Sequence, residues 1–319
     1  MVKYSIIVPC YNAEKYIENL YHIFSKSNRE DYEVIFVDDC SKDNTYDKLL
    51  NSINKKKNFI VLQTEKNGGP GIARNKALEH VQGKFVMFCD SDDYFDIKVL
   101  DYIDKFVDNS NVDMLVFPYY IERNKKKIKC DEYSKYSEGE KICVTEVASK
   151  SGMLLMKVFN NSIIRDNQIR FLDRMTGEDK CFCIDYLIHA NDIFKCNYVF
   201  YNYVQNKKSI MHTHKVHENK METTFEILEK KYETYFPEII KIVYVNDYLL
   251  SNIKHFTKTK KSGNYIKKWL REKNKKYPNW IYEVDFDNQN LYRKLIYKAM
   301  YNENPYMIKL VMWIRRIMF

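Results

Sequence analysis

An apolar run that ends in a cluster of carboxylates is the stretch of this sequence best suited to chemistry. Residues 85–89 are typical of a buried strand, and residues 90–93 (Asp-Ser-Asp-Asp) follow it directly. Because a buried carboxylate without a partner is costly to ionise, we expect the cluster to face water or a cation. Hard oxygen ligands in an Asp-x-Asp arrangement suit Mg²⁺ or Mn²⁺ held together with substrate phosphates. The alternative is an acidic turn in which Asp92 or Asp93 caps a helix over residues 94–107.

Two further predicted strands also lead into polar residues. Residues 4–9 form an apolar strand before Tyr11 and Asn12, and residues 33–38 form another before Asp39. Helical patterns of about ten residues separate these strands, which is typical of βαβ units and a parallel sheet. Ligands bind at the carboxyl ends of such strands, so we expect the three polar ends to face one site.

The side chains at these strand ends are of the types that a nucleotide requires. The ring of Tyr11 can stack on a base, and the carboxylate of Asp39 can accept the imide N–H of uracil. Residues 67–71 (Asn-Gly-Gly-Pro-Gly) allow close approach of the backbone, and Arg74 suits a phosphate or a carboxylate that must be oriented. Taken alone, the glycine cluster is also typical of an ordinary tight turn, and Arg74 of a structural ion pair.

The alternation of strands and helices predicts an α/β fold with a mostly parallel, Rossmann-like sheet flanked by helices. Strands covered on both faces should be uniformly apolar, as these are. The polar stretch 122–141 predicts a hairpin or a mobile loop. From about residue 217 the pattern is helical, so we expect one domain over residues 1–215 and a helical, basic region over residues 216–319.

Charge and cysteine usage restrict the kinds of partner and compartment. The chain has 52 Lys and Arg against 43 Asp and Glu, and lysines concentrate between residues 207 and 276. Such a segment predicts an anionic partner or else a solvated helical face. The eight cysteines have no spacing typical of a zinc site or a disulfide framework, and the chain begins without a secretory leader, which favours a reducing cytosol. No run approaches the ~20 apolar residues of a membrane span.

The last predicted helix, over residues 307–319, carries an apolar stripe with Lys309 and Arg316 on the opposite face. This pattern is typical of a helix that lies on an anionic membrane. It equally fits a terminal helix that packs on its own domain or on a second subunit. The stripe consists of Met307, Leu310, Val311, Ile314, Ile317 and Met318.

Four motifs together resemble glycosyltransferase family 2. In order they are SIIVPCYN at 5–12, VDDCSKD at 37–43, NGGPGIARN at 67–75 and DSDD at 90–93. The resemblance is strong over about the first 110 residues and weak to about residue 210. It implies a GT-A fold, a nucleotide-sugar donor (usually a UDP-sugar), Mn²⁺ or Mg²⁺, and inversion at the anomeric carbon. The nucleotide sugar would bind at about residues 1–110 and the acceptor at about 111–215.

The same matching implies roles for individual residues. Pro9, Tyr11 and Asp39 would hold the uridine, Asp90 would contact the ribose or nucleotide, and Asp92 would ligate the metal. The full nucleotide-sugar set is Pro9, Tyr11, Asn12, Asp39, Asn67, Gly69, Arg74, Asp90 and Ser91.

An inverting displacement also needs a carboxylate within hydrogen-bond reach of the acceptor hydroxyl. Residues 176–179 (Thr-Gly-Glu-Asp) bring two acids to the start of a helix predicted over residues 178–190. Bacterial members of the family resemble this arrangement, with an aromatic residue after the acids (here Phe182) and the aspartate as the usual base. We therefore predict Asp179 as the general base and Glu178 as the residue that positions the acceptor. The alternative is that the two acids only cap the helix.

His212 and His214 are further candidates, either to complete the metal shell or to contact the pyrophosphate after loop closure. In isolation, a surface His-x-His usually has no function.

The expected enzyme is an inverting glycosyltransferase, hexosyl or N-acetylhexosaminyl, for capsule, teichoic acid or a similar surface polysaccharide. Its acceptor would be a glycan or lipid-linked hydroxyl. We expect a cytoplasmic protein that contacts the inner face of the cell membrane through its C-terminal helices. We expect no nucleic-acid partner, and the sequence does not decide whether the chain forms a homo-oligomer. A sugar nucleotidyltransferase is one alternative, but it needs a glycine-rich basic loop that residues 9–12 lack. A non-catalytic module that binds anionic ligands or membranes is the other.

Overall fold

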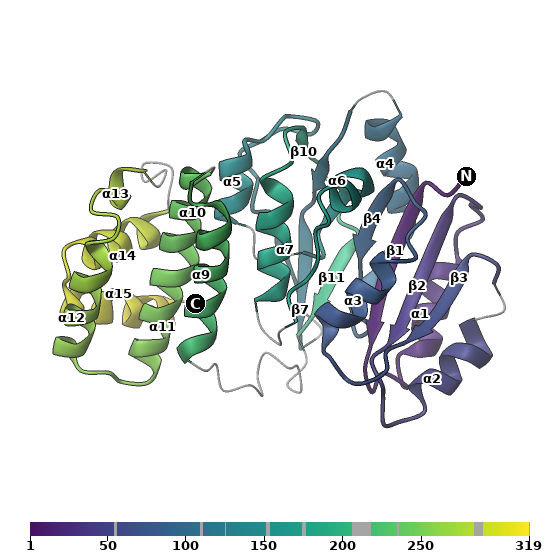
Figure 1. Cartoon of the computed structure of the whole chain (residues 1–319), viewed down its shortest axis with the longest axis horizontal. Coiled ribbons are helices and arrows are strands. Elements are labelled where there is room, and N and C mark those ends of the chain that lie inside the picture. Colours follow the sequence, from purple (N-terminus) through teal and green to yellow (C-terminus); the bar gives the residue numbers. More distant parts are fainter. Residues whose placement is uncertain are drawn as a thin grey trace. The chain divides into compact units, whose positions relative to one another are not determined.

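The computed structural model describes residues 1–53, 56–108, 111–124, 126–150, 154–173, 177–205, 218–234, 236–283 and 290–318. The chain divides into two compact units, Met1–Lys215 and Val216–Phe319. The described part of the first unit contains two sheets with flanking helices, and that of the second contains helices alone (Figure 1).

A seven-stranded sheet forms the centre of the first unit, with the order β10-β6-β9-β4-β1-β2-β3. Neighbouring strands are parallel except where β9 pairs with β4 and β6. β1, β2 and β4 are buried along their whole length, as expected for strands covered on both faces. The predicted mostly parallel α/β sheet is therefore confirmed. Its strands are β1 (Tyr4–Cys10), β2 (Tyr32–Asp38), β3 (Phe59–Gln63), β4 (Phe85–Phe88), β6 (Met114–Val116), β9 (Lys157–Asn160) and β10 (Ile193–Lys195).

Helices pack on this sheet through aromatic side chains. Phe24 of α1 meets Phe36 of β2 edge to face at 6.0 Å, and Phe182 of α7 meets Phe88 of β4 at 5.6 Å. Such contacts stabilise by about 1 kcal/mol beyond the buried area. The helices of the first unit are α1 (Ile17–Ser25), α2 (Thr45–Lys48) continuing into the π-helix η1 (Leu49–Ile53), α3 (Pro70–Leu78), α4 (Val99–Val107), α5 (Val144–Ser149), α6 (Asn161–Asp166) and α7 (Glu178–Leu187).

A second sheet of four strands corrects one prediction. Its order is β5 (Tyr94–Phe95), β11 (Tyr201–Val204), β7 (Tyr119–Arg123), β8 (Lys126–Cys130). β7 and β8 form a hairpin, but its strands begin before the predicted stretch 122–141 and end at Cys130. Because Phe95 pairs with Tyr201, residues 94–95 are a strand and α4 begins only at Val99, with Lys98 as its N-cap. The helix predicted from residue 94, and its capping by Asp92 or Asp93, are therefore wrong.

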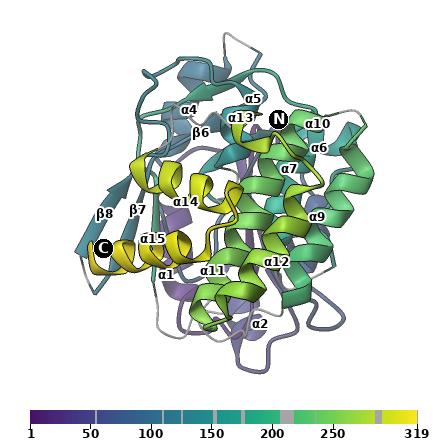
Figure 2. The same cartoon turned by 90° about the vertical axis from the view of Figure 1, so that its left-hand side faces the viewer.

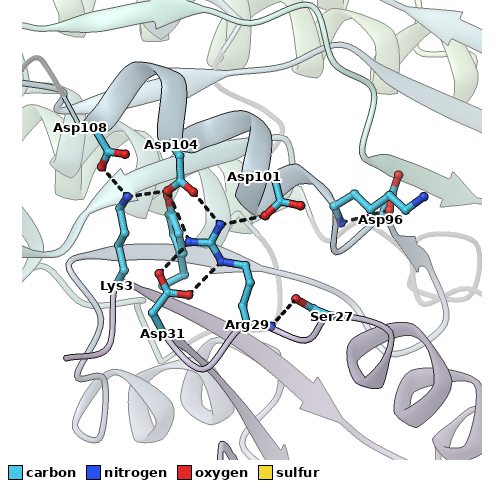
Figure 3. Close-up of polar contacts among 10 residues, drawn as sticks. Lys3, Ser27, Arg29, Asp31, Asp96, Asp101, Asp104 and Asp108 are labelled. Atoms are coloured by element: carbon cyan, nitrogen blue, oxygen red, sulfur yellow. Dashed lines mark hydrogen bonds and ion pairs between the residues drawn. The ribbon is translucent and has the colours of Figure 1, made fainter.

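A charged cluster holds α4 to the amino ends of β1 and β2 (Figure 3). Arg29 donates to both carboxylate oxygens of Asp31 at 2.8 and 2.6 Å and to Asp104 of α4 at 2.6 Å. Lys3 donates to Asp104 at 2.5 Å. The members of this Arg29 cluster are Lys3, Arg29, Asp31, Asp101, Asp104 and Asp108.

The Arg29 cluster gives a stability prediction with a defined pH dependence. Although burial opposes it, hydrogen bonds from Arg29 and Lys3 lower the pKa of Asp104 to about 2. The carboxylate therefore stabilises the fold above the ordinary Asp pKa, and this contribution is lost as the pH falls towards 2. We expect Arg29→Met to lower the free energy of unfolding at pH 7 by about 2 kcal/mol, and by less near pH 3.

Urea denaturation at the two pH values measures this difference. Arg165→Met is the matched control, because Arg165 pairs with Asp166 while both side chains are mostly exposed, so its removal should change stability by less than about 0.5 kcal/mol. Equal stability of Arg29→Met and wild type at pH 7 would show that the cluster contributes nothing to the fold.

The second unit is built from helices around aromatic side chains such as Trp280, Tyr244 and Tyr297, all buried. α14 and α15 lie side by side (Figure 2). Within the part of the chain that the structure describes, no helix is both long enough and apolar enough to span a membrane. The elements are α9 (Glu218–Tyr232), α10 (Pro237–Val243), the π-helix η2 (Tyr244–Leu249), α11 (Leu250–Lys258), α12 (Gly263–Asn274), α13 (Trp280–Glu283), α14 (Leu291–Tyr301) and α15 (Pro305–Met318).

Four side chains of the apolar stripe predicted for the last helix are described, and those of Ile317 and Met318, together with that of Arg316, lie outside the described side chains. Val311 is buried together with Ile308, which was not predicted. Three outward apolar side chains are at least 40% exposed: Met307, Leu310 and Ile314. The helix therefore packs on its own unit with one apolar side and presents another, with the exposed Trp313 beside it.

Candidate functional site

The three polar strand ends meet at one edge of the main sheet. β1 lies between β2 and β4 and runs parallel to both, with Cys10 opposite Asp38 at the end of β2. The loops after the three strands therefore leave the sheet on the same side (Figure 1). This brings Tyr11, Asp39 and Asp92 to one edge, as the sequence predicted.

The loop after β1 leaves an aromatic ring at the surface. Tyr11 is 40% exposed, whereas Pro9 is buried within β1. Asn12 has the left-handed φ of 49°, and its N–H donates to Ser41 Oγ at 2.9 Å. Its Oδ1 accepts from the N–H of Lys42 at 2.9 Å, so Asn12 links the loops after β1 and β2. This linking role was not predicted from the sequence.

Asp39 is buried and joins the glycine turn. Its Oδ1 accepts from Thr64 Oγ1 at 2.8 Å and from the N–H of Gly68 at 3.1 Å, and its Oδ2 accepts from the N–H of Gly69 at 2.7 Å. Gly69 has φ 86°, a conformation that favours glycine, and Pro70 begins α3 directly after it, while Asn67 is exposed. A carboxylate oxygen accepts two hydrogen bonds, so Oδ2 retains capacity for an imide N–H.

Asp38 is a further candidate that sequence reasoning did not single out. It is fully buried, and its Oδ2 accepts from the N–H of Ser41 at 3.2 Å and from Gln63 Nε2 at 3.0 Å. Its Oδ1 is buried without a hydrogen-bond partner within the part of the chain that the structure describes. In the sequence, the feature that could have identified Asp38 as a candidate was its position directly before Asp39.

The acidic turn after β4 is anchored by its last member. Asp93 is buried and accepts hydrogen bonds from Tyr201 Oη and from the N–H of Val204, both at 2.7 Å. Tyr201 Oη in turn accepts from the N–H of Asp90 at 3.0 Å. Burial, and then the charge of Asp90, raise the pKa of Asp93 to about 8. Asp93 thus attaches the turn to β11, and Asp90, Ser91 and Asp92 remain partly accessible.

The described residues do not form a complete metal site by themselves. No group of three or more His, Cys, Asp or Glu side chains among them is arranged to hold a metal. Asp92 lies partly exposed at the sheet edge, and Mg²⁺ characteristically takes one or two carboxylates together with substrate phosphates and water. Asp92 therefore fits a cation that is bound jointly with a diphosphate. His212 and His214 lie outside the described residues.

Arg74 of α3 contacts both the acidic turn, residues 90–93, and the acid pair at the start of α7, Glu178 and Asp179. Its side chain is 2% exposed; Nη2 donates to Asp90 Oδ1 at 2.8 Å and Nη1 donates to Asp179 Oδ1 at 2.5 Å. Nη1 also lies 3.9 Å from Glu178 Oε1, and the guanidinium lies over the ring of Phe171, 5.4 Å from its centre. The buried arginine therefore orients two partly exposed carboxylates through its ion pairs.

The acid pair begins α7 directly after Gly177, the N-cap, which has φ 81°. Glu178 is buried, whereas the Asp179 side chain is 34% exposed. Burial, and then the charge of Asp179, raise the pKa of Glu178 to about 7. Burial also raises the pKa of Asp179, but Arg74 opposes this shift. Asp179, the more exposed and directly paired acid, is therefore the better candidate for an ionised base.

Two other contacts bring α3 close to α7 and were not predicted. A Cβ on Gly71 would lie 3.1 Å from Glu178 Cγ, so this glycine permits the approach. Asn75 exchanges two hydrogen bonds of 2.8 Å with the backbone of Phe171, whose ring stacks on Phe182 at 4.1 Å. The signal for both contacts was the motif at 67–75, which contains Gly71 and Asn75.

The predicted site residues thus form two contact groups. Asp39 holds the turn that contains Asn67 and Gly69, and Arg74 holds Asp90 together with the acid pair. The turn at residues 67–69 belongs to the first group, and Arg74 of α3, which follows this turn directly, belongs to the second. The turn and α3 therefore connect the polar sheet edge with the start of α7.

Comparisons with known proteins give one family and a closely matching fold. Residues 5–161 match the model for glycosyl transferase family 2. Poly(ribitol-phosphate) beta-N-acetylglucosaminyltransferase TarS of Staphylococcus aureus (strain Mu50 / ATCC 700699) is 29% identical over 296 residues, which cover 88% of this chain and 48% of TarS. The putative teichuronic acid biosynthesis glycosyltransferase TuaG of Bacillus subtilis (strain 168) is 45% identical over 89 residues, or 28% of this chain and 35% of TuaG.

The crystal structure of residues 1–349 of S. aureus TarS in complex with UDP-GlcNAc matches with a TM-score of 0.73 and 22% identity, over 99% of this chain and 92% of that one. This likeness shows the GT-A fold that the sequence motifs implied, with C-terminal helices present. The chain spans about half the length of TarS and about a third of the length of TuaG.

Proposed function

Because residues 5–161 belong to glycosyl transferase family 2, we propose that this protein is a metal-assisted, inverting glycosyltransferase. It moves a hexosyl or N-acetylhexosaminyl group from a UDP-sugar to a hydroxyl of a surface glycan or lipid-linked acceptor. The observation that carries the proposal is the meeting of Asp90, Asp179 and Arg74, which puts a predicted donor residue beside the predicted base. The activity named for TarS supports an N-acetylglucosaminyl donor and a polyol-phosphate glycan as acceptor.

The donor binds at the sheet edge in this proposal. Tyr11, with its exposed ring, stacks on uracil, and Asp39 Oδ2 accepts the imide N–H. The turn at 67–71 allows the backbone to approach the nucleotide, and its conformation is fixed by Asp39. Cytosine presents an acceptor where uracil presents this N–H, so the carboxylate discriminates between the two bases.

Transfer is a single displacement at the anomeric carbon. The acceptor oxygen forms the new bond to that carbon while its proton passes to Asp179, and the bond to the diphosphate oxygen breaks as UDP takes the electron pair. Attack from the side opposite the leaving group inverts the anomeric centre. Glu178, with a pKa of about 7, is partly protonated at neutral pH and can donate a hydrogen bond that positions the acceptor.

Asp92 would hold the Mn²⁺ or Mg²⁺, and this cation supplies charge neutralisation for the departing diphosphate. Opposite unit charges about 4 Å apart attract by ~4 kcal/mol at an effective dielectric of 20, against ~1 kcal/mol in water. His212 and His214 remain proposed additional ligands.

We also propose contact with the inner face of the cell membrane through α15. Leu310, Ile314 and Trp313 are exposed on this helix, and Lys309 is available for anionic lipid headgroups. A lipid-linked acceptor would be presented at such a surface. The same apolar side would alternatively be covered by a second copy of the chain.

Ligand-dependent thermal stability tests the proposed function. We expect UDP and UDP-sugars with Mn²⁺ to raise the melting temperature by several degrees, because a ligand at a hundred times its Kd stabilises by ~2.7 kcal/mol. CDP is the matched control and should have little effect, since it lacks the imide N–H. If no UDP-sugar shifts the transition or is turned over in the presence of Mn²⁺, the proposal is wrong.

A further inference from the structure

The buried guanidinium of Arg74 is shared between two carboxylates that come from different parts of the chain. Asp90 follows β4, and Asp179 begins α7, 89 positions later. Each receives its own Nη group, at 2.8 and 2.5 Å, so the fork of the arginine spans the gap between them. Nε is buried without a hydrogen-bond partner among the described residues, so the two Nη groups make the polar contacts.

We infer that Arg74 is a positioning residue that holds the base Asp179 in a fixed place relative to Asp90 on the donor side of the site. The inference rests on the proposed function and deepens it, because it assigns Arg74 to the base instead of to the donor phosphates. The geometry supports this assignment: both Nη groups are directed at carboxylates and the side chain is 2% exposed.

The charges around Asp179 make this arginine important for its protonation. The groups that face Asp179 in the described structure are Arg74 from α3, Asp90 from the acidic turn, Lys157 from β9 and the adjacent Glu178. Burial and the charge of Asp90 raise the pKa of Asp179, and Arg74 is the largest influence that lowers it, ahead of Lys157. Without Arg74, the pKa of Asp179 would rise and less of the base would be ionised at neutral pH.

A lysine cannot replace this function fully. Its ammonium keeps the positive charge but lacks the planar fork that reaches two carboxylates at once. The stacking of the guanidinium on Phe171 would also be lost. Arg74→Lys should therefore restore part of the protonation effect while leaving the position of Asp179 less well fixed, whereas Arg74→Met removes both.

The test is the pH profile of kcat for UDP-sugar turnover, with Mn²⁺ present, in wild type, Arg74→Met and Arg74→Lys. We expect Arg74→Met to lose about a hundredfold in kcat at pH 6.5 and about tenfold at pH 8.5, with donor KM changed less than kcat. Arg74→Lys should have a profile between the two. Arg29→Met is the matched control: it also removes an arginine from a carboxylate cluster, and it should keep the wild-type profile.

Three results would overturn the inference: an unchanged profile in Arg74→Met, an equal loss at both pH values, or a rise in donor KM without a fall in kcat. A second measurement does not depend on turnover. ¹³C NMR titration of the Asp179 carboxyl should give a higher pKa in Arg74→Met, or in Arg74→Lys if the methionine variant does not fold, than in wild type. An unchanged titration overturns the inference even if the enzyme is active. A wild type that turns over no UDP-sugar overturns the proposed function, and the titration still decides the electrostatic role of Arg74.

Discussion

Asp179→Asn is expected to lower the rate of sugar transfer by about a thousandfold while leaving the affinity for UDP within about a factor of three. Asparagine cannot take the proton of the acceptor hydroxyl, so the general-base contribution is lost. Its amide oxygen can still accept the hydrogen bond from Arg74 Nη1, so the packing of α7 against α3 should persist. UDP release assays measure the rate, and calorimetric titration of UDP with Mn²⁺ measures the affinity.

The control for this variant is Asp166→Asn, which changes an exposed carboxylate at the end of α6 and should leave both quantities unchanged. Loss of UDP binding in Asp179→Asn would make Asp179 a donor-site residue instead of the base. Transfer at the wild-type rate would exclude it from the reaction.

Asp92→Ala is expected to reduce transfer at least a thousandfold and to remove the response of the enzyme to Mn²⁺. A thousandfold change corresponds to ~4 kcal/mol of transition-state stabilisation, which is the size of the attraction available to a cation beside a departing diphosphate in a partly closed cleft. The fold should be retained, because the hydrogen bonds of Asp93 to Tyr201 and Val204, which attach the acidic turn to β11, remain in this variant.

Activity as a function of Mn²⁺ concentration, together with the melting temperature without ligand, tests this prediction. Asp93→Asn is the complementary variant: because it alters the buried anchor, it should change stability as well as activity. Wild-type turnover in Asp92→Ala, or undiminished wild-type activity after removal of divalent metals with a chelator, would refute the metal assignment.

Local patterns were sufficient for the centre of the fold. β1, β2 and β4 are largely apolar runs separated by helical patterns, so their parallel pairing followed from general rules, whereas their order in the sheet was not predicted. The error at residues 94–98 has a different origin. Phe95 is in a strand because it pairs with Tyr201 and packs on Phe200 at 5.0 Å, and contacts across a hundred positions leave no local periodic signal.

The site shows the same limit. Residue types and motif order identified Asp39, Asp92 and the acid pair as candidates, and the parallel sheet explains why the strand ends meet. The contact of Arg74 with Asp179 depends on how α7 approaches α3, which no spacing in the sequence encodes. The linking role of Asn12 likewise depends on a left-handed backbone conformation in the folded loop.

A crystal structure of the protein with UDP and Mn²⁺ would show directly whether the donor binds at this sheet edge. We expect uracil stacked on Tyr11, its imide N–H on the carboxylate of Asp39, and the cation between Asp92 and the diphosphate. UDP bound away from this sheet edge, or a cation held by other residues without Asp92, would contradict it.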